Sequence, residues 1–277
     1  MLRAKSFTGG LMASELSVLF RRRRTWAMLV TISLIPIFLA IAVSLSGSAV
    51  PPGEGPPFLD RVSQNGLFVA FTAMIMAIPL FLPLTIGVVA GDTIAGEANT
   101  GTLRYLLIAP VDRARLLVVK FFGAAAFALA GTFTLALTGI AIGAILFPIG
   151  PVTLLSGDVI SIPEALARIF LIAIYVTISL MGLSAIGLFI STLTVIPVGA
   201  MAATVVISTV SQILGTLPQT SAIHPYLITY YWLGFADILR NPMDLSSLIS
   251  NTLLQLAYIA IFGSLAYSRF TTKDILS

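Results

Sequence analysis

The chain has 277 residues, of which 58% are apolar and only 9% are charged, with a net charge of +4. Soluble domains normally carry about a quarter charged residues, so this composition excludes a water-soluble globular protein and indicates an integral membrane protein. The sequence contains no cysteine and a single histidine, His224, which leaves neither disulfides nor a thiolate or histidine cluster for a metal. We therefore expect no metal site.

The first expected element is an amphipathic helix over residues 8–23. Its apolar side is formed by residues at helical spacing, namely Met12, Leu16, Leu19 and Phe20. Four arginines, Arg21 to Arg24, end this segment, so we expect it to lie in the inner interface of the membrane near anionic headgroups. The apolar run after the arginines is far longer than the core of a cleavable signal peptide, which disfavours cleavage.

Six membrane spans are predicted from the stretches that carry no charge, because about 20 apolar residues are needed to cross the hydrocarbon core. The stretch from Ile169 to Ala236 is long enough for two spans, and Pro197 divides it. Pro79 and Pro83 are expected to kink the second span. The expected spans are about residues 25–49, 67–90, 118–147, 166–190, 195–217 and 246–268.

The basic residues orient these spans. With six spans both termini share one face, and that face carries twelve of the fifteen Lys and Arg residues. We therefore expect a multi-pass protein of the plasma membrane with both termini and residues 91–117 in the cytoplasm. The net positive charge of the chain is accounted for by the Lys and Arg residues on the cytoplasmic face, so no nucleic-acid partner is expected.

The expected spans contain no Asp, Glu, Lys or Arg near their centres. Carriers driven by protons or sodium usually need such groups, or broken helices that coordinate ions, at mid-membrane. Ser, Thr and Gln212 are interpreted as hydrogen-bonding groups within the bundle. An ion-coupled carrier or channel is therefore the less favoured alternative, and the energy for transport should arrive through a contact on the aqueous side.

Residues 91–120 carry seven charges between two uncharged tracts. Gly101 and Pro110 bracket a segment compatible with a short helix across the cytoplasmic surface, and Asn99 or Thr100 is available as its cap. Asp112 can cap the helix that enters the third span. The plainer alternative is a loop in which Glu97 and Asp112 pair with neighbouring arginines.

The longest outer segment, residues 218–244, is aromatic and weakly charged. Its apolar stretch is too short to cross the bilayer, so we expect a re-entrant or interfacial element. The aromatic residues suit a belt at the membrane interface, and the lining of a substrate exit is the alternative. These residues are Tyr226, Tyr230, Tyr231, Trp232 and Phe235. A lipid enzyme would need convergent polar groups, and only Asp237, His224 and Arg240 approach that requirement.

The run GDTIAGE, followed by GTLRYLL, AP-V-D-R and Lys120, closely resembles the intracellular loop of ABC-2 type permeases, the membrane subunits of ATP-driven exporters. The resemblance covers nearly the whole chain and includes HPYLITYYWLGFADILRNP, which looks like the outer re-entrant region of that family. It implies an all-α membrane protein with six transmembrane helices, an N-terminal interfacial helix, a cytoplasmic coupling helix and an outer re-entrant segment. The residues it marks in the outer region are Pro225, Tyr230, Tyr231, Trp232, Asp237 and Arg240.

In that family a coupling helix in the intracellular loop sits in a groove of the ATP-binding subunit. The resemblance implies a contact set of Glu97, Gly101, Thr102, Leu103, Arg104 and Leu107, with Arg113 and Arg115 as flanking support. It also implies two copies of an ATP-binding subunit and a second permease, identical or homologous. The sequence has no GxxxxGK[ST] phosphate loop, so ATP and Mg should bind the partner, and this chain is expected to be neither an enzyme nor a cofactor carrier.

The expected function is the permease subunit of an exporter of hydrophobic or amphiphilic compounds, such as a drug, lipid or peptide. A non-transporting ABC-type complex that couples ATP hydrolysis to an extracytoplasmic process is the alternative within the family. Membrane lipids are the remaining expected partners.

Overall fold

The computed structural model describes residues 2–46, 59–102 and 112–272. In this part of the chain six helical segments are long and apolar enough to cross a membrane, which confirms the predicted number of spans. They are α2 (Arg23–Leu45), α5 (Phe81–Asn99), α7 (Arg113–Leu146), α8 with α9 (Ile162–Ser179 and Met181–Leu193), α10 (Pro197–Thr216) and α11 (Ser246–Thr272). The other elements are α1 (Leu2–Arg21), α3 (Leu59–Val62), α4 (Phe68–Ala77), β1 (Val152–Thr153), β2 (Val159–Ile160), η1 (Pro218–Tyr226) and η2 (Gly234–Leu239).

The second predicted span, residues 67–90, differs most from the structure. It is broken into α4 and α5 around Pro79, which cannot donate a backbone hydrogen bond, while Pro83 falls in the first turn of α5, where no donor is needed. The Gln212 amide of α10 donates to the free Pro79 carbonyl at 2.7 Å. The helix α5 then continues through two charged residues to Asn99, beyond the predicted end at residue 90.

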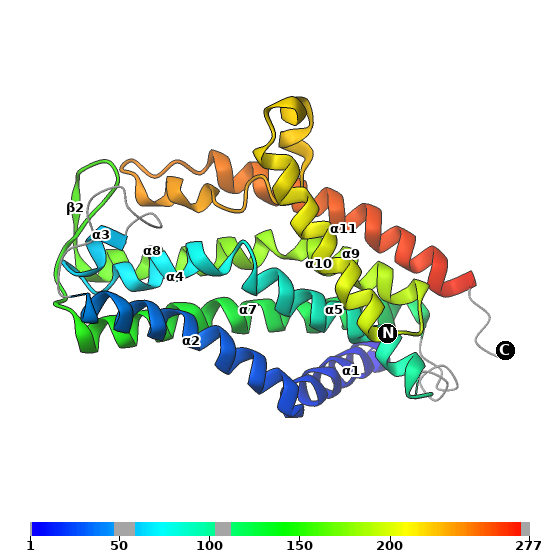
Figure 1. Ribbon diagram of the computed structural model, residues 1–277. Helices are drawn as coiled ribbons and strands as arrows, with labels where there is room; N and C mark the ends of the chain where they lie inside the picture. Colours follow the sequence, from blue (N-terminus) through cyan, green and yellow to red (C-terminus); the bar gives the residue numbers. More distant parts are fainter. Residues whose placement is uncertain (1, 47–58, 103–111, 273–277) are drawn as a thin grey trace.

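The helix α7, the longest described, runs the length of the bundle and contacts α1, α2, α4, α5, α8, α9 and α11 (Figure 1). The half of α7 farther from α1, which we call the outer half, packs closely against α4 because small residues face each other. A Cβ at Gly139 would lie 2.6 Å from the Ala70 Cα, and one at Gly143 would lie 2.1 Å from the Gly66 carbonyl oxygen. The two helices can approach this closely only because these positions carry no side chain.

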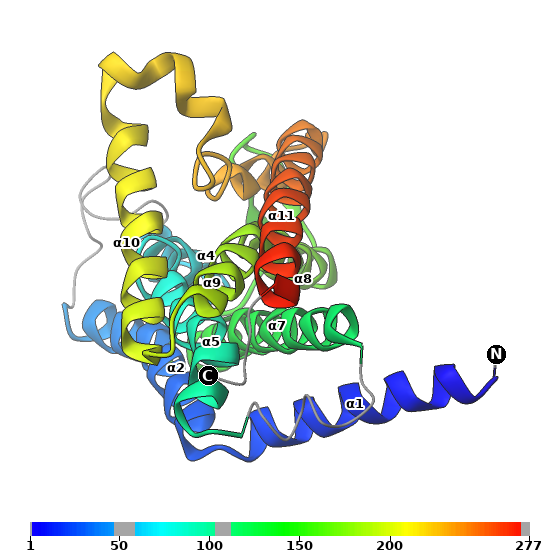
Figure 2. The same ribbon diagram turned by 90° about the vertical axis from the view of Figure 1, so that its right-hand side faces the viewer.

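The helix α10 lies at the edge of the bundle, and the chain after it projects beyond the other helices (Figure 2). It packs against α5, where Gly87 and Gly91 leave room for the Val205 side chain and the Met201 backbone. Only 22% of the residues in its most apolar stretch are buried, against 67% for α8 with α9. The rest of its surface is therefore left for lipid or for another protein.

The outer end of the bundle, opposite α1, is closed by short polar links. Between α7 and α8, β1 and β2 form an antiparallel pair, with Val152 opposite Ile160. The Asn65 amide donates to the Gly150 carbonyl at 2.8 Å, and the Arg61 guanidinium donates to the Thr153 carbonyl at 2.9 Å. These bonds attach the hairpin to the start of α4.

The segment 218–244 folds back onto α8 and α11 through η1 and η2. Trp232 and Phe235 are buried at 2% and 1% exposure, so their prediction as membrane-interface residues is wrong. Both pack in the core because side chains of the bundle hydrogen-bond to the backbone of this segment. The Tyr175 hydroxyl, for example, donates to the Tyr231 carbonyl at 2.5 Å. Tyr226 and Tyr230 stay exposed, as a belt requires.

A glycine substitution tests the α4–α7 contact. We expect Gly139→Ala to lower the melting temperature of the detergent-purified protein, since overpacking typically costs about 1–3 kcal/mol. Gly263→Ala in α11 is the matched control, because no heavy atom lies within 4 Å of its added Cβ. Equal melting temperatures for the two variants would contradict the close contact.

Candidate functional site

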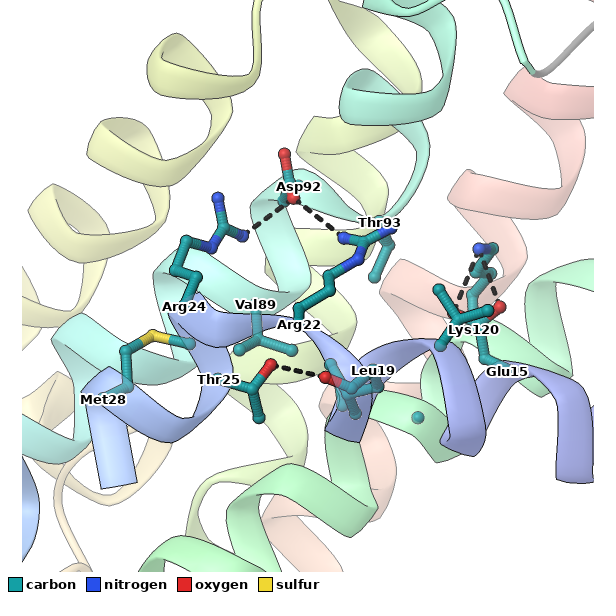
Figure 3. Close-up of a pocket in the computed structure, with 13 residues that line it drawn as sticks. Glu15, Leu19, Arg22, Arg24, Thr25, Met28, Val89, Asp92, Thr93 and Lys120 are labelled. Carbon is teal, nitrogen blue, oxygen red and sulfur yellow. Dashed lines mark hydrogen bonds and ion pairs between the residues drawn. The ribbon is translucent and has the colours of Figure 1, made fainter. Parts of the chain in front are cut away.

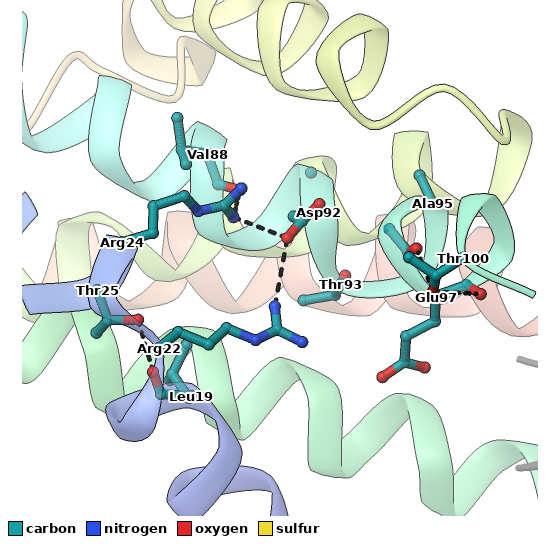
Figure 4. A network of polar contacts seen from close by, with 12 residues as sticks. Leu19, Arg22, Arg24, Thr25, Val88, Asp92, Thr93, Ala95, Glu97 and Thr100 are labelled. Carbon is teal, nitrogen blue, oxygen red and sulfur yellow. Dashed lines mark hydrogen bonds and ion pairs between the residues drawn. The ribbon is translucent and has the colours of Figure 1, made fainter. Parts of the chain in front are cut away.

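Six charged side chains lie in two neighbouring groups of ion pairs at the end of the bundle where α1, α2, α5 and α7 converge (Figures 3 and 4). We call them the inner cluster: Glu15, Arg22, Arg24, Asp92, Glu97 and Lys120. Three bases face three acids, so the cluster has no formal net charge. It brings together the N-terminal helix and the two helices on either side of residues 100–112.

Lys120 is the buried member of the inner cluster, with 3% of its side chain exposed. Its ammonium group donates to both carboxylate oxygens of Glu15, at 3.0 and 2.9 Å, and to Oε1 of Glu97. A buried ammonium is strongly unfavourable unless it is paired and hydrogen-bonded, so the two carboxylates are needed to keep it there. Lys120 therefore fastens α7 to α1 and to the end of α5.

Asp92 accepts from two arginines at the corner between α1 and α2 (Figure 4). The distances are 2.8 Å from Arg24 and 3.4 Å from Arg22, whose side chains are nearly half exposed. Exposed pairs of this kind contribute about 0–1 kcal/mol each. All four arginines from Arg21 to Arg24 keep exposed side chains, so the expected contact with anionic headgroups stays a prediction.

Glu97 was predicted to contact an ATP-binding subunit, and the alternative paired it with an arginine. The structure instead directs its carboxylate toward Lys120, with 15% of the side chain exposed. Its second oxygen, Oε2, is buried and has no hydrogen-bond partner among the described residues. Glu97 therefore faces the interior of the protein, one turn before the chain leaves α5.

The end of α5 is shaped by Thr100, Gly101 and Thr102. The Thr100 hydroxyl donates to the Gly96 carbonyl at 3.0 Å, and Thr102 donates to the Glu97 carbonyl at 3.2 Å. Gly101 has a φ of +73°, a left-handed conformation that favours glycine and ends the helix. Gly101 and Thr102 are exposed, whereas Leu103, Arg104 and Leu107 of the predicted contact set lie outside the described residues.

The start of α7 is capped as predicted. The Asp112 carboxylate accepts from the Ala114 backbone N–H at 3.2 Å. The Arg113 guanidinium donates to the Phe270 and Thr271 carbonyls, both at 2.9 Å, and so satisfies the last turn of α11. Arg115 is half-buried. The predicted flanking residue Arg113 thus connects the beginning of one helix with the end of another.

The outer set of predicted residues is divided between surface and core. Pro225 and Tyr230 are exposed, Tyr231 stacks edge-on against Tyr230, and Trp232 is buried. The Asp237 carboxylate pairs with Arg240 at 3.3 Å and accepts from the Ser247 hydroxyl. These contacts fix the fold of segment 218–244 and gather no cluster of catalytic groups in the part that the structure describes.

Two neighbouring residues also fix the outer segment. Nε2 of His224 lies 3.1 Å from the Leu214 carbonyl at the end of α10. The Asp244 carboxylate accepts from the Ser246 backbone N–H at 2.8 Å, which lowers the pKa of Asp244 below its usual value. Both side chains therefore stabilise helix ends.

Comparison with protein families gives a match to the model described as ABC-2 family transporter protein, over residues 11–275. The chain belongs to this family. It is thus a multi-pass membrane protein and the membrane transport component of an ABC transporter, a role that is typically not itself catalytic. Members of the family associate with an ABC ATP-binding subunit. A search of curated proteins found no match.

Sequence reasoning about this ABC-2 protein missed the inner cluster, although one signal was present. Glu15 lies three residues after Met12 and four before Leu19, on the apolar side of the predicted helix. A carboxylate on an apolar face indicates a buried cationic partner. No comparable local signal identifies Lys120 as that partner, because 105 residues separate the two in the chain.

Removing the buried ammonium should release α1. We expect Lys120→Met to destabilise the protein by about 3–5 kcal/mol, because two carboxylates are left facing each other without a cation. Thermal unfolding and the rate of trypsin cleavage near residues 21–24 measure the effect. The triple variant Glu15→Gln, Glu97→Gln, Lys120→Met removes the repulsion and should recover most of the stability. If Lys120→Met alone were as stable as the wild type, the role of Lys120 would be contradicted.

Asp92 provides the exposed comparison within the same cluster. Asp92→Asn should cost no more than about 1 kcal/mol for each pair, because both arginines keep access to water. The melting temperature should therefore fall much less than in Lys120→Met. If the melting temperature fell as far in Asp92→Asn as in Lys120→Met, the pairs with Arg22 and Arg24 would be the main contacts that stabilise the corner between α1 and α2.

Proposed function

We propose that this chain is the permease subunit of an ATP-driven exporter, and that residues 91–117 receive the movement of the ATP-binding subunit. One observation carries the proposal. The two helices that border the predicted coupling segment, α5 and α7, are joined to each other and to α1 by Lys120. A force applied between Gly101 and Asp112 would therefore act on three helices together.

The proposed contact surface begins where α5 ends. Gly101 and Thr102 are exposed there, and Leu103, Arg104 and Leu107 follow directly in the sequence. Arg113 and Arg115 flank the other side. Glu97 belongs to the interior side of this surface, so its proposed role is to position the end of α5 through Lys120 rather than to bind the partner.

The polarity of the described helices favours a hydrophobic or amphiphilic substrate. Their buried charged side chains lie near the ends of spans: Lys120 at the inner end of α7 and Arg168 at the outer end of α8. Among the described residues, the buried polar groups between these ends are Ser, Thr, Asn and Gln. This arrangement suits a cargo with an apolar body better than a small ion.

The remaining parts of the proposal come from the resemblance. ATP and Mg would bind two copies of a partner subunit, and a second permease, identical or homologous, would complete the complex. We place the complex in the plasma membrane with both termini in the cytoplasm, because the inner cluster and the exposed arginines lie on the same face.

The test distinguishes a loss of coupling at the contact surface from a loss of stability at the inner cluster. In a reconstituted complex, Arg104→Ala with Leu107→Ala should lower ATPase stimulation by amphiphilic compounds about 5- to 150-fold, the usual range of coupling between sites. Complex assembly and melting temperature should change little, since all six residues of the inner cluster are retained in this variant. Arg21→Ala, exposed on α1, is the control. Normal stimulation and assembly in the double variant would contradict the coupling assignment.

A further inference from the structure

An apolar groove of about 530 Å³ lies between the inner ends of α7 and α11 and the middle of α9. Its volume falls within the range of ligand pockets, about 300–1,000 Å³. The larger side chains of its wall are Leu117, Val118, Phe121, Phe122, Leu188 and Ile259. Val118 and Phe122 are each 51% exposed, so the groove opens toward the surroundings of the bundle.

The interior of this groove offers almost nothing to a polar ligand. Of its two polar side chains, Ser264 donates to the Ala260 carbonyl of its own helix at 2.6 Å, and Tyr267 lies near the end of α11. Along α7 the groove extends from Ala114 to Phe122, about 12 Å at about 1.5 Å per residue. A groove of this length and composition inside a bilayer suits a hydrocarbon chain.

Two arginines lie within one turn of lining residues at the inner end of the groove. Arg115 precedes Val118 and Phe122 by three and seven residues, so it continues their row on α7 by one turn toward the end of the helix. Arg269 lies three residues after the lining residue Ala266, in the last turn of α11. In the described part of the chain neither arginine forms an ion pair.

We propose that this groove is a binding site for an anionic phospholipid, which nothing in the family assignment provides. One acyl chain lies along the apolar wall of α7, α9 and α11, and the phosphate contacts Arg115 and Arg269 at the inner end. An apolar interior, with an arginine one turn away on each of α7 and α11, matches both parts of such a lipid. The site shares Arg115 with the flank of the proposed coupling surface, and its apolar wall contains no residue of the inner cluster.

Gly263 allows the groove to be filled without disturbing the fold. It lines the groove, and no heavy atom lies within 4 Å of a Cβ placed on it, so Gly263→Phe puts a ring into empty space. Ala257→Phe is the matched control, because Ala257 is exposed on the same helix and is not part of the groove. Both variants add the same side chain to α11.

The measurement is native mass spectrometry of the complex with its ATP-binding subunit, after addition of phosphatidylglycerol or phosphatidylcholine. We expect the wild type and Ala257→Phe to retain phosphatidylglycerol, and Gly263→Phe to bind it at least about tenfold more weakly. Equal lipid retention by the two phenylalanine variants would overturn the proposal. Loss of a protein subunit from Gly263→Phe with unchanged lipid would assign the groove to a protein contact and would overturn it as well.

A second pair of measurements tests the headgroup. Arg115→Gln and Arg269→Gln should each reduce the preference for phosphatidylglycerol over phosphatidylcholine about fivefold, while phosphatidylcholine binding stays constant. If the variant that carries both Arg115→Gln and Arg269→Gln keeps the same preference for phosphatidylglycerol, the assignment of the phosphate to these arginines is overturned. The lipid count is the readout because Arg115 also flanks the proposed coupling surface.

Discussion

A lysine ammonium placed inside an apolar bundle must be neutralised, and the inner end of this protein is organised by that requirement. Lys120 draws Glu15 from the N-terminal helix and Glu97 from the end of α5 to one nitrogen. The pair to Glu15 joins α1 to α7 by an ion pair as well as by packing. The position of α1 and the direction in which the chain leaves α5 thus depend on one buried cation.

At the outer end, too, a buried cationic side chain that is paired and hydrogen-bonded joins separate elements. Arg168, 4% exposed, donates to the Ile238 carbonyl at 2.8 Å and to the Arg240 carbonyl at 2.9 Å, and it pairs with Glu164. Its buried side chain therefore holds segment 218–244 against α8. Between the two ends, uncharged groups take over: Gln255 of α11 accepts from the Gly182 backbone N–H and donates to the Ile228 carbonyl. Charges are used where water is near, and neutral hydrogen bonds where it is absent.

The number of spans, the division at Pro197 and the Asp112 cap were predictable because each depends on local chemistry. The end of α5 was not, since the prediction took charged residues as the end of a helix. Asp92 and Glu97 continue the helix because Arg22, Arg24 and Lys120 from other elements neutralise them.

Segment 218–244 shows the same limit of sequence reasoning. Its aromatic composition indicated an interface, whereas the burial of Trp232 and Phe235 depends on hydrogen bonds from α8 and α11 that no local pattern reveals. The predicted contact residues at Gly101 and Thr102 are exposed as a partner surface requires. The inner cluster behind them could be inferred only in part, from the position of Glu15.

The close approach of Gly139 to Ala70 gives α7 arms of unequal length. From Gly139 the helix extends 26 residues to Arg113 and 7 residues to Leu146, about 39 Å inward and about 10 Å outward. If α7 tilts as a rigid rod about this contact, a displacement at its inner end is reduced about fourfold at its outer end, and the force is increased in the same ratio. The position of one glycine would thus make α7 a lever that converts a wide movement at Arg113 into a smaller movement with greater force near the β1–β2 hairpin.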